Sequence, residues 1–229
     1  MWKRTARGRE LHFYLAGINN QNFLMRDRET GSWWQQVTGH AIAGELAGSA
    51  LELMPTDELT FALWKSEGPY GLVLAPVAGR EKDYDQAWEK EVAKYPAPLT
   101  FPGQGLKDRE VILGVEMGGQ ARAFPLAKVR GQSLVEDKIG GVPVALVTGP
   151  DGESVRVFRS QWNGSDIELY RDAQSPQWRL LDSQGNTWNF AGCATSGPAA
   201  GQCLEKINFL KDYWFDWKNY NPRTTVYSH

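Results

Sequence analysis

The chain of 229 residues carries a formal net charge of −2, with 41% hydrophobic and 23% charged residues. These values are typical of a globular protein and exclude an intrinsically disordered chain, which holds fewer apolar groups. The charge balance, without a long basic run, argues against nucleic-acid binding, and no apolar stretch is long enough to predict a membrane-spanning helix.

The start of the chain has one feature of a secretion signal, because four of its first ten residues are basic. The apolar run that follows, residues 11–16, is interrupted by His12 and is too short for the hydrophobic part of a signal peptide. We therefore expect no export signal within this chain.

Residues 11–38 have the pattern of a β-hairpin. Strand-like runs occupy residues 11–16 and 22–25, and residues 32–38 form the return strand. Between them, residues 27–31 supply turn chemistry, with Asp first and Gly last.

Residues 79–109 predict a linker that contains one helix, over about residues 83–95. Asp83 can cap this helix, and aromatic and aliphatic residues then recur at near-helical spacing up to Tyr95. Pro96 ends the pattern. We expect this helix to dock between two lobes.

Three further hairpins follow, each marked by a glycine turn between two apolar runs. The turns are expected at residues 118–119, 151–152 and 183–185. Successive hairpins favour an antiparallel meander or small barrel over βαβ units. The predicted fold class is therefore mainly β (a β-rich α+β protein), with antiparallel hairpins, short helices and one linker helix.

An internal repeat is the strongest pattern in the sequence. At a constant offset of 153 residues, the second copy carries the same glycines, leucine, Trp-Lys pair, proline and valine as the first. The first-copy residues are Gly39, Gly44, Gly48, Leu51, Trp64, Lys65, Pro69 and Val73. Such a series without an internal gap indicates duplication. Each copy reads as a hairpin, a glycine-rich loop, a short helical turn and a final strand.

The repeat predicts three regions. Residues 1–78 form the back half of a first module, residues 79–109 the linker, and residues 110–229 a second, complete module. The β-rich front half of the second module, residues 110–160, has no counterpart before the first. We therefore expect a front half to be missing at the N-terminus, and an unpaired sheet edge left there would favour self-association.

The repeat resembles a known bacterial family. The segments that carry the resemblance are Met25–Gly39, Ala121–Leu126 and Trp214–Lys218. They are similar to the family catalogued as domain of unknown function 3179, over nearly the whole chain. The resemblance implies that a front half ending in a cysteine-containing segment usually precedes the position of Met1. It implies no activity or cofactor.

Cys193 and Cys203 are the only cysteines, and both lie in the glycine-rich loop of the second copy. Their counterparts in the first copy are His40 and Ala50. Because both cysteines are peculiar to one copy, we predict a disulfide, which implies an oxidising, extracytoplasmic compartment. The alternative is a pair of buried thiols in a cytoplasmic protein. Neither the cysteines nor the three histidines have the spacing of a metal site.

The candidate catalytic residues are Asp27 and His40. Asp27 and its repeat equivalent Asp182 could form an acid–base pair, although each also opens a tight turn. His40 is the histidine best placed to act as an acid, base or ligand, although a solvated loop histidine is the simpler interpretation. The candidate ligand-binding residues are Trp33, Trp34, Gln35, Gln36 and Trp188.

The ten tryptophans leave core packing and ligand contact as alternatives. The tryptophans repeated in the two copies, at positions 34, 64, 188 and 217, are expected to fill equivalent cores. Alternatively, some line a cleft that binds a small-molecule ligand.

Three functions remain open. The first is an extracytoplasmic ligand-binding or accessory protein with an aromatic-lined cleft between the modules. The second is an enzyme whose site lies near the first glycine-rich loop. The third is a purely structural module. The sequence contains no nucleotide-binding or serine-hydrolase motif.

Overall fold

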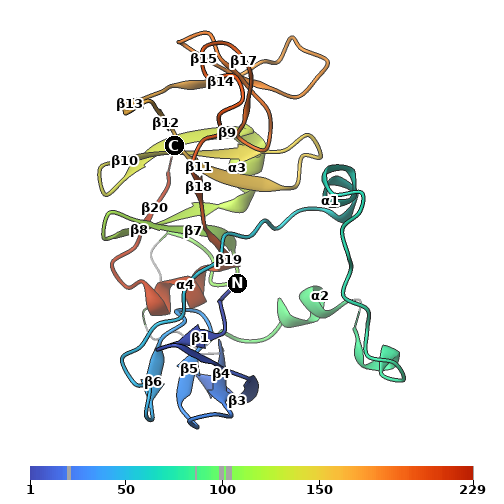
Figure 1. Ribbon diagram of the computed structural model, residues 1–229, viewed down its shortest axis with the longest axis vertical. Helices are drawn as coiled ribbons and strands as arrows, with labels where there is room; N and C mark the ends of the chain where they lie inside the picture. Colours follow the sequence, from blue (N-terminus) through green and yellow to red (C-terminus); the bar gives the residue numbers. More distant parts are fainter. Residues whose placement is uncertain (20–21, 86, 98–100, 102–104, 229) are drawn as a thin grey trace.

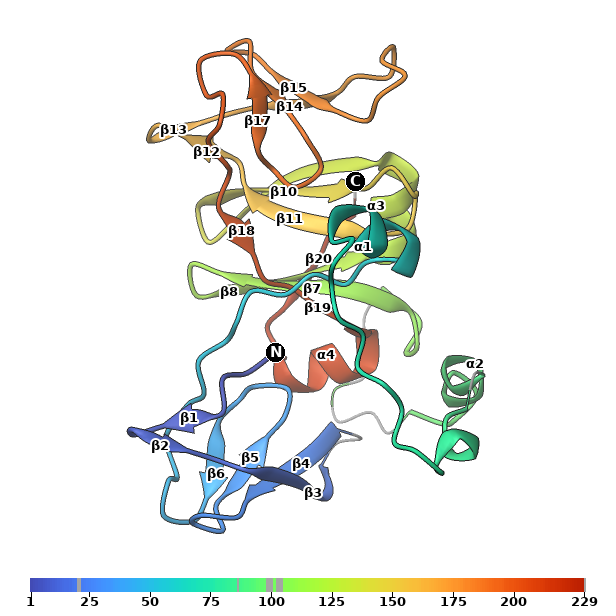
Figure 2. The same ribbon diagram turned by 45° about the vertical axis from the view of Figure 1, so that its right-hand side comes forward.

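The computed structural model describes residues 1–19, 22–85, 87–97, 101 and 105–228. Figure 1 shows tiers along the long axis, with one small β lobe at each end and two stacked sheets between them. The view turned by 45° in Figure 2 keeps the same order of tiers. All but one of the strand pairs are antiparallel, which confirms the predicted mainly β fold.

The N-terminal lobe, residues 1–54, contains a short hairpin and a four-stranded antiparallel meander. The hairpin strands are β1 (Thr5–Ala6) and β2 (Arg9–Glu10), and the meander strands are β3 (Phe13–Asn19), β4 (Asn22–Asp27), β5 (Trp33–Gln35) and β6 (Ala41–Ala43). Its core is built around the fully buried Trp34. The hairpin predicted over residues 11–38 is therefore confirmed.

Two four-stranded sheets form a central sandwich. In order, the first consists of β19 (Leu210–Tyr213), β7 (Val111–Met117), β8 (Gln120–Pro125) and β20 (Thr225–Val226). The second consists of β18 (Lys206–Ile207), β11 (Val155–Arg159), β10 (Val142–Thr148) and β9 (Leu134–Ile139). Alternating apolar side chains of both sheets, such as Leu113, Phe124, Val144 and Val157, form one buried cluster between them.

The sandwich contains elements that the sequence pattern did not predict. Helix α3 (Leu126–Gln132) follows β8 directly and buries Leu126 and Val129 in the sandwich core. Strand β9 pairs with β10 through a Gly140–Gly141 turn. A side chain at Gly140 would lie 2.5 Å from the carbonyl oxygen of Met117, so this turn requires glycine for close approach as well as for its positive φ.

The C-terminal lobe, residues 160–204, resembles the N-terminal lobe in its order of strands. It contains the hairpin of β12 (Gln161–Trp162) and β13 (Ser165–Asp166), and a meander of β14 (Leu169–Arg171), β15 (Leu180–Asp182), β16 (Thr187–Trp188) and β17 (Ala194–Ser196). Trp188 is fully buried in its core. Trp34 and Trp188, each in the third strand of its meander, are thus both central to the core of their lobe.

The two copies share backbone hydrogen bonds as well as residue types. The amide of Leu51 donates to the carbonyl oxygen of Gly39 at 2.9 Å, and 153 residues later Leu204 donates to Gly192 at 2.8 Å. Helix α1 (Phe61–Glu67) and helix α4 (Trp214–Tyr220) are related by the same offset at both ends. Equivalent residues therefore occupy equivalent places in the two folds.

The correspondence extends into the first ten residues at an offset of 156. The Arg7–Gly8 turn has φ values of 46° and 76°, and the Asn163–Gly164 turn has values of 50° and 76°. Sequence comparison did not detect this part of the repeat, because the turn geometry is kept while almost every side chain differs.

The linker is less regular than the sequence predicts. A 3-10 helix (Glu81–Asp83) and helix α2 (Trp88–Val92) replace the single helix expected over residues 83–95. The apolar stripe of that helix does not dock on a lobe, since Tyr84, Trp88 and Tyr95 are all more than half exposed. In the described part of the chain, no helix has both the length and the apolar character needed to cross a membrane.

Candidate functional site

The repeat-equivalent aspartates are committed to their own turns. Asp27 accepts a hydrogen bond from the buried indole of Trp34 at 2.7 Å, and Asp182 accepts one from Trp188 at 2.9 Å. Burial acts to raise the pKa of Asp27, but the bonds from Trp34 and Thr30 outweigh it and lower that pKa. Both pairs join a turn to a lobe core, and neither aspartate is near the other, because the lobes lie at opposite ends of the molecule (Figure 1).

The remaining candidates of the first glycine-rich loop do not converge on one pocket. Trp33 is half-buried beneath the guanidinium group of Arg26, and Gln35 accepts a bond from Thr38 at 2.9 Å. Gln36 and His40 are exposed. Within the described residues, no group of three or more His, Cys, Asp or Glu side chains is arranged to hold a metal ion.

Cys193 and Cys203 form a disulfide across the C-terminal lobe loop, as predicted. The two cysteines face each other in an antiparallel bridge, and His40 and Ala50 form the same bridge in the N-terminal lobe. The disulfide therefore reinforces a contact that the fold makes in both copies.

Two carboxyl groups meet at the joint between α4 and the N-terminal lobe. Asp212 lies near the end of β19, and Asp216 lies in the first turn of α4, where it is 7% exposed. The side-chain amide of Asn22, from the start of β4, donates to Asp216. The hydroxyl of Tyr220 donates to the carbonyl oxygen of Asn19 at 3.1 Å, which adds a second contact across this joint.

These two carboxyls share a proton more readily than isolated aspartates do. Burial raises the pKa of Asp212, and the nearby charge of Asp216 raises it further. Burial also raises the pKa of Asp216, although hydrogen bonds from Asp212 and Asn22 oppose this effect. A protonated Asp212 can donate to Asp216, so the pair can hold or deliver one proton at this joint.

The repeat identifies a second site, at the end of the N-terminal copy. We call residues 57–75 the first clasp and residues 210–228, their equivalents, the second clasp. The second clasp comprises β19, α4 and β20 and closes the first sandwich sheet. The first clasp contains α1 and lies beside the second sandwich sheet (Figure 2).

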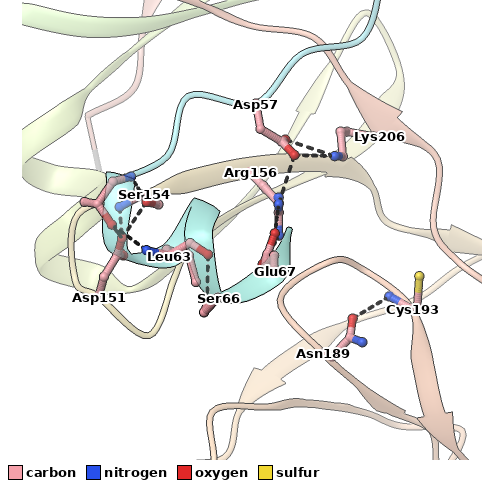
Figure 3. A network of polar contacts seen from close by, with 11 residues as sticks. Asp57, Leu63, Ser66, Glu67, Asp151, Ser154, Arg156, Asn189, Cys193 and Lys206 are labelled. Carbon is pink, nitrogen blue, oxygen red and sulfur yellow. Dashed lines mark hydrogen bonds and ion pairs between the residues drawn. The ribbon is translucent and has the colours of Figure 1, made fainter. Parts of the chain in front are cut away.

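A buried arginine fixes the C-terminal end of α1 (Figure 3). Arg156 of β11 is 3% exposed and bonds both oxygens of Glu67, at 2.9 and 2.6 Å, and one oxygen of Asp57 at 2.9 Å. Lys206 also bonds Asp57, at 2.8 and 2.9 Å. Burial acts to lower the pKa of Arg156, but its two carboxylate partners outweigh it, so the guanidinium stays charged.

A second polar cluster fixes the N-terminal end of α1. Thr60 caps the helix, its hydroxyl bonds Asp151 at 2.7 Å, and its amide bonds the Ser154 hydroxyl at 2.9 Å. Burial acts to raise the pKa of Asp151, but hydrogen bonds, led by those of Ser154 and Thr60, lower it to about 2. The first clasp is thus attached to the sandwich by hydrogen bonds at the N-terminal end of its helix and by an ion pair at the C-terminal end.

An open cavity of about 700 Å³ lies between the first clasp and β11. Its wall combines apolar side chains, including Phe61, Trp64 and Leu72, with the ion pair of Glu67 and Arg156. Ligand sites commonly combine this volume with an apolar wall and a few fixed polar groups. The arrangement is suited to binding.

Sequence reasoning missed Arg156, Glu67 and the Asp212–Asp216 pair. Arg156 alternates with valines in an apolar strand, which is the one sequence pattern that could have indicated a buried charge. Comparing the copies could have indicated the carboxyl pair, because Asp212 and Asp216 replace Leu59 and Leu63 at the common offset.

The family described as Protein of unknown function (DUF3179) matches residues 1–224. No curated protein and no solved structure matches the chain. The matched range includes both lobes, both clasp helices and the sandwich strands other than β20.

Proposed function

The chain belongs to DUF3179, a family of proteins of unknown function, and from the geometry of its site we propose that it is an extracytoplasmic binding protein. Its ligand occupies the cavity between the first clasp and β11. The observation that carries this proposal is the exposed apolar wall of the cavity. Phe61 is 63% exposed, although it lies on a helix that polar bonds hold in place at both ends.

An exposed apolar surface of this kind marks an interaction site rather than a structural surface. The clasp is anchored through Thr60 and Glu67, so its apolar side chains remain in position instead of collapsing onto the sandwich. A preformed site loses less conformational entropy on binding than a mobile one. The geometry therefore favours binding over the purely structural alternative.

The extracytoplasmic location is supported by the Cys193–Cys203 disulfide, since such bonds persist mainly in oxidising compartments. We also propose, from the internal repeat, that residues 1–78 and 110–229 are two modules joined by the linker at residues 79–109. In this proposal the cavity lies where the end of the first module meets the second.

The dye 8-anilinonaphthalene-1-sulfonate provides a probe for the cavity. We expect its fluorescence to rise on addition of the protein and to fall by at least half for the variant Phe61→Ser/Trp64→Ser. The matched control is Tyr84→Ser/Trp88→Ser, which removes two exposed aromatic rings from the linker. If the control variant loses as much signal as the cavity variant, or if the dye does not bind at all, the proposal is wrong.

A second candidate function is acid–base catalysis at the lobe joint. One observation favours it: Asp212 and Asp216 are buried together with raised pKa values where the first copy has leucines. This site replaces the one expected at Asp27 and His40 in the enzyme hypothesis. Chromogenic esters, glycosides and phosphates provide the test. Turnover by the natural protein that Asp216→Asn abolishes would support catalysis, and no turnover of any of these substrates would count against it.

A further inference from the structure

The second clasp shows what a clasp of this repeat binds. Its strand β19 pairs antiparallel with β7, placing Leu210 opposite Gly114, and its strand β20 pairs parallel with β8. Helix α4 crosses between these strands and buries Trp214 and Trp217 against the β7–β8 hairpin, leaving them 1% and 3% exposed. A clasp therefore holds a β-hairpin by two strand pairings and two aromatic rings.

The first clasp has the same helix but holds no hairpin. Phe61 is 63% exposed where its equivalent Trp214 is 1% exposed, and Leu74 is 96% exposed where Tyr227 is 7% exposed. Within the described residues, no strand pairs with residues 57–60 or 72–73, the equivalents of β19 and β20. The described chain thus contains two clasps and one hairpin of the β7–β8 type.

The opposite side of the first clasp explains why this surface stays open. Leu59 and Leu63 pack against the core cluster that includes Trp188 and Phe190. Together with the bonds of Thr60 and Glu67, these contacts fix α1 with its Phe61 and Trp64 side toward the cavity. The helix is held by the second module, and among the described residues no β-strand covers its Phe61 and Trp64 side.

The second clasp also specifies the residues that a fitting hairpin needs. A side chain at Gly114 would lie 2.4 Å from the ring of Trp217, so the gripped strand must carry glycine there. Ala123 on the neighbouring strand packs beside the same ring. Trp64 is the equivalent of Trp217 and requires the same glycine and small residue opposite it.

We infer that the first clasp is a docking site for a β-hairpin of a partner polypeptide with the residue pattern of β7–β8. The hairpin adds strands to residues 57–60 and 72–73 and places its glycine over Trp64. Main-chain hydrogen bonds along exposed strand edges are a common means of peptide recognition. This inference rests on the proposed binding function and names the chemical class of its ligand.

The probe is a synthetic peptide of residues 109–127 of this chain, which contains the β7–β8 hairpin and no tryptophan. The peptide is cyclised through its ends, because an isolated two-stranded hairpin is only marginally stable. Binding to the full chain is measured by calorimetry and by tryptophan fluorescence. The matched control peptide carries Gly114→Val, which fills the space that the tryptophan ring needs.

We expect the peptide to bind the natural chain and Trp88→Ser equally, and to bind Trp64→Ser and Phe61→Ser at least tenfold more weakly. Circular dichroism establishes whether each variant is folded. If Trp64→Ser does not fold, Phe61→Ser alone tests the inference. The Gly114→Val peptide should bind at least tenfold more weakly to the natural chain.

Equal binding of the two peptides, or equal binding to Trp64→Ser and the natural chain, would overturn the inference. If the dye binds in the cavity and the peptide does not, the binding function stands and the hairpin ligand is wrong. If neither binds, both proposals fail. Concentration-dependent dimers that Trp64→Ser abolishes would assign the surface to a second copy of this chain and would also overturn the inference.

Discussion

Asp216 of α4 occupies the position that Leu63 occupies in α1, 153 residues earlier in the repeat. The leucine packs against the core cluster of the C-terminal lobe, whereas the aspartate accepts a bond from Asn22 of the N-terminal lobe. The two clasp helices therefore contact opposite lobes of the molecule through the same helical position. One contact is apolar and the other contains a buried carboxyl.

The carboxyl pair predicts an unusual dependence of stability on pH. Burial raises the pKa of both Asp212 and Asp216 above the ordinary value of 3.8. Between pH 4 and neutrality the unfolded chain therefore binds fewer protons at these sites than the folded chain. The free energy of unfolding must fall as pH rises through this range, by on the order of 1–3 kcal/mol.

Below pH 4, other aspartates lower the free energy of unfolding as the pH falls, because their stabilising carboxylates become protonated. The pKa of Asp151 is lowered to about 2, because its hydrogen bonds outweigh burial, so its contribution is lost only in acid. We therefore expect maximum stability near pH 4. Urea unfolding from pH 3 to pH 8 measures this profile, and Asp212→Asn/Asp216→Asn should flatten its neutral side. A natural chain that becomes steadily more stable up to pH 7 would contradict the assignment.

Replacing the pair by the residues of the other copy tests the cost of burying it. Asp212→Leu/Asp216→Leu should raise the free energy of unfolding at pH 7 by about 1–3 kcal/mol, because apolar side chains of similar volume often replace buried charges favourably. Asn22 would lose its acceptor, which limits the gain. Urea titration at pH 7 is the measurement.

The matched control for this substitution is Asp27→Leu. It also replaces a buried aspartate, but this carboxylate accepts bonds from the Trp34 indole and from Thr30. Leaving the buried indole without an acceptor should cost about 1–3 kcal/mol. The two variants should therefore change the free energy of unfolding in opposite directions, which would distinguish a destabilising carboxyl pair from a stabilising turn aspartate. Stabilisation by Asp27→Leu would contradict this distinction.

Arg156 should control the attachment of the first clasp. In Arg156→Ala, the carboxylates of Glu67 and Asp57 lose their main partner, and the guanidinium contact over the Phe190 ring, at 4.5 Å, is removed. We expect faster cleavage by trypsin at Lys65, within α1, and a stability loss of roughly 3 kcal/mol, as for other broken buried pairs. Mass spectrometry of the fragments locates the cleavage.

A control on the same strand separates this effect from general loss of charge. Arg159 also lies on β11, but its side chain is 33% exposed and its ion pair is with Glu205, outside the clasp. Arg159→Ala should leave cleavage at Lys65 within twofold of the natural rate. Equal protection of Lys65 in Arg156→Ala and the natural chain would show that the ion pair does not hold the clasp.

The local features of this fold were predictable because they depend on local chemistry. The repeat glycines have positive φ, which few other residues tolerate, so Gly39 and Gly192 remain recognisable in both copies. The hairpin turns at residues 118–119 and 151–152 are determined in the same way. Helix α3 was not predicted, because its stability comes from burying Leu126 and Val129 in the sandwich core, a contact between parts of the chain distant in sequence.

The sites could not be predicted, because they depend on contacts distant in sequence. Asp216 meets Asn22, 194 residues away in sequence, and Arg156 meets Glu67, 89 residues away. A residue pattern within one strand or helix does not specify such partners. Phe61 is likewise exposed because, among the described residues, no hairpin covers the first clasp. This difference from the second clasp is visible only when the two copies are compared in three dimensions.

The equivalence of the two glycine-rich loops predicts that a second disulfide can be built. Cys193 and Cys203 face each other in an antiparallel bridge, and His40 and Ala50 form the same bridge in the N-terminal lobe. The variant His40→Cys/Ala50→Cys should therefore oxidise in air without backbone rearrangement. A loop of this length stabilises the fold by roughly 3 kcal/mol in the chain-entropy model.

Intact mass with and without reductant gives the number of disulfides, and thermal unfolding of the two forms gives the stabilisation. The control, Thr38→Cys/Ala50→Cys, introduces the same number of thiols at positions that form no bridge. A second disulfide in the first variant alone, with a higher melting temperature, would establish that the two loops share one backbone geometry. If His40→Cys/Ala50→Cys stays reduced in air, the loops differ and the structural equivalence of the copies fails at this point.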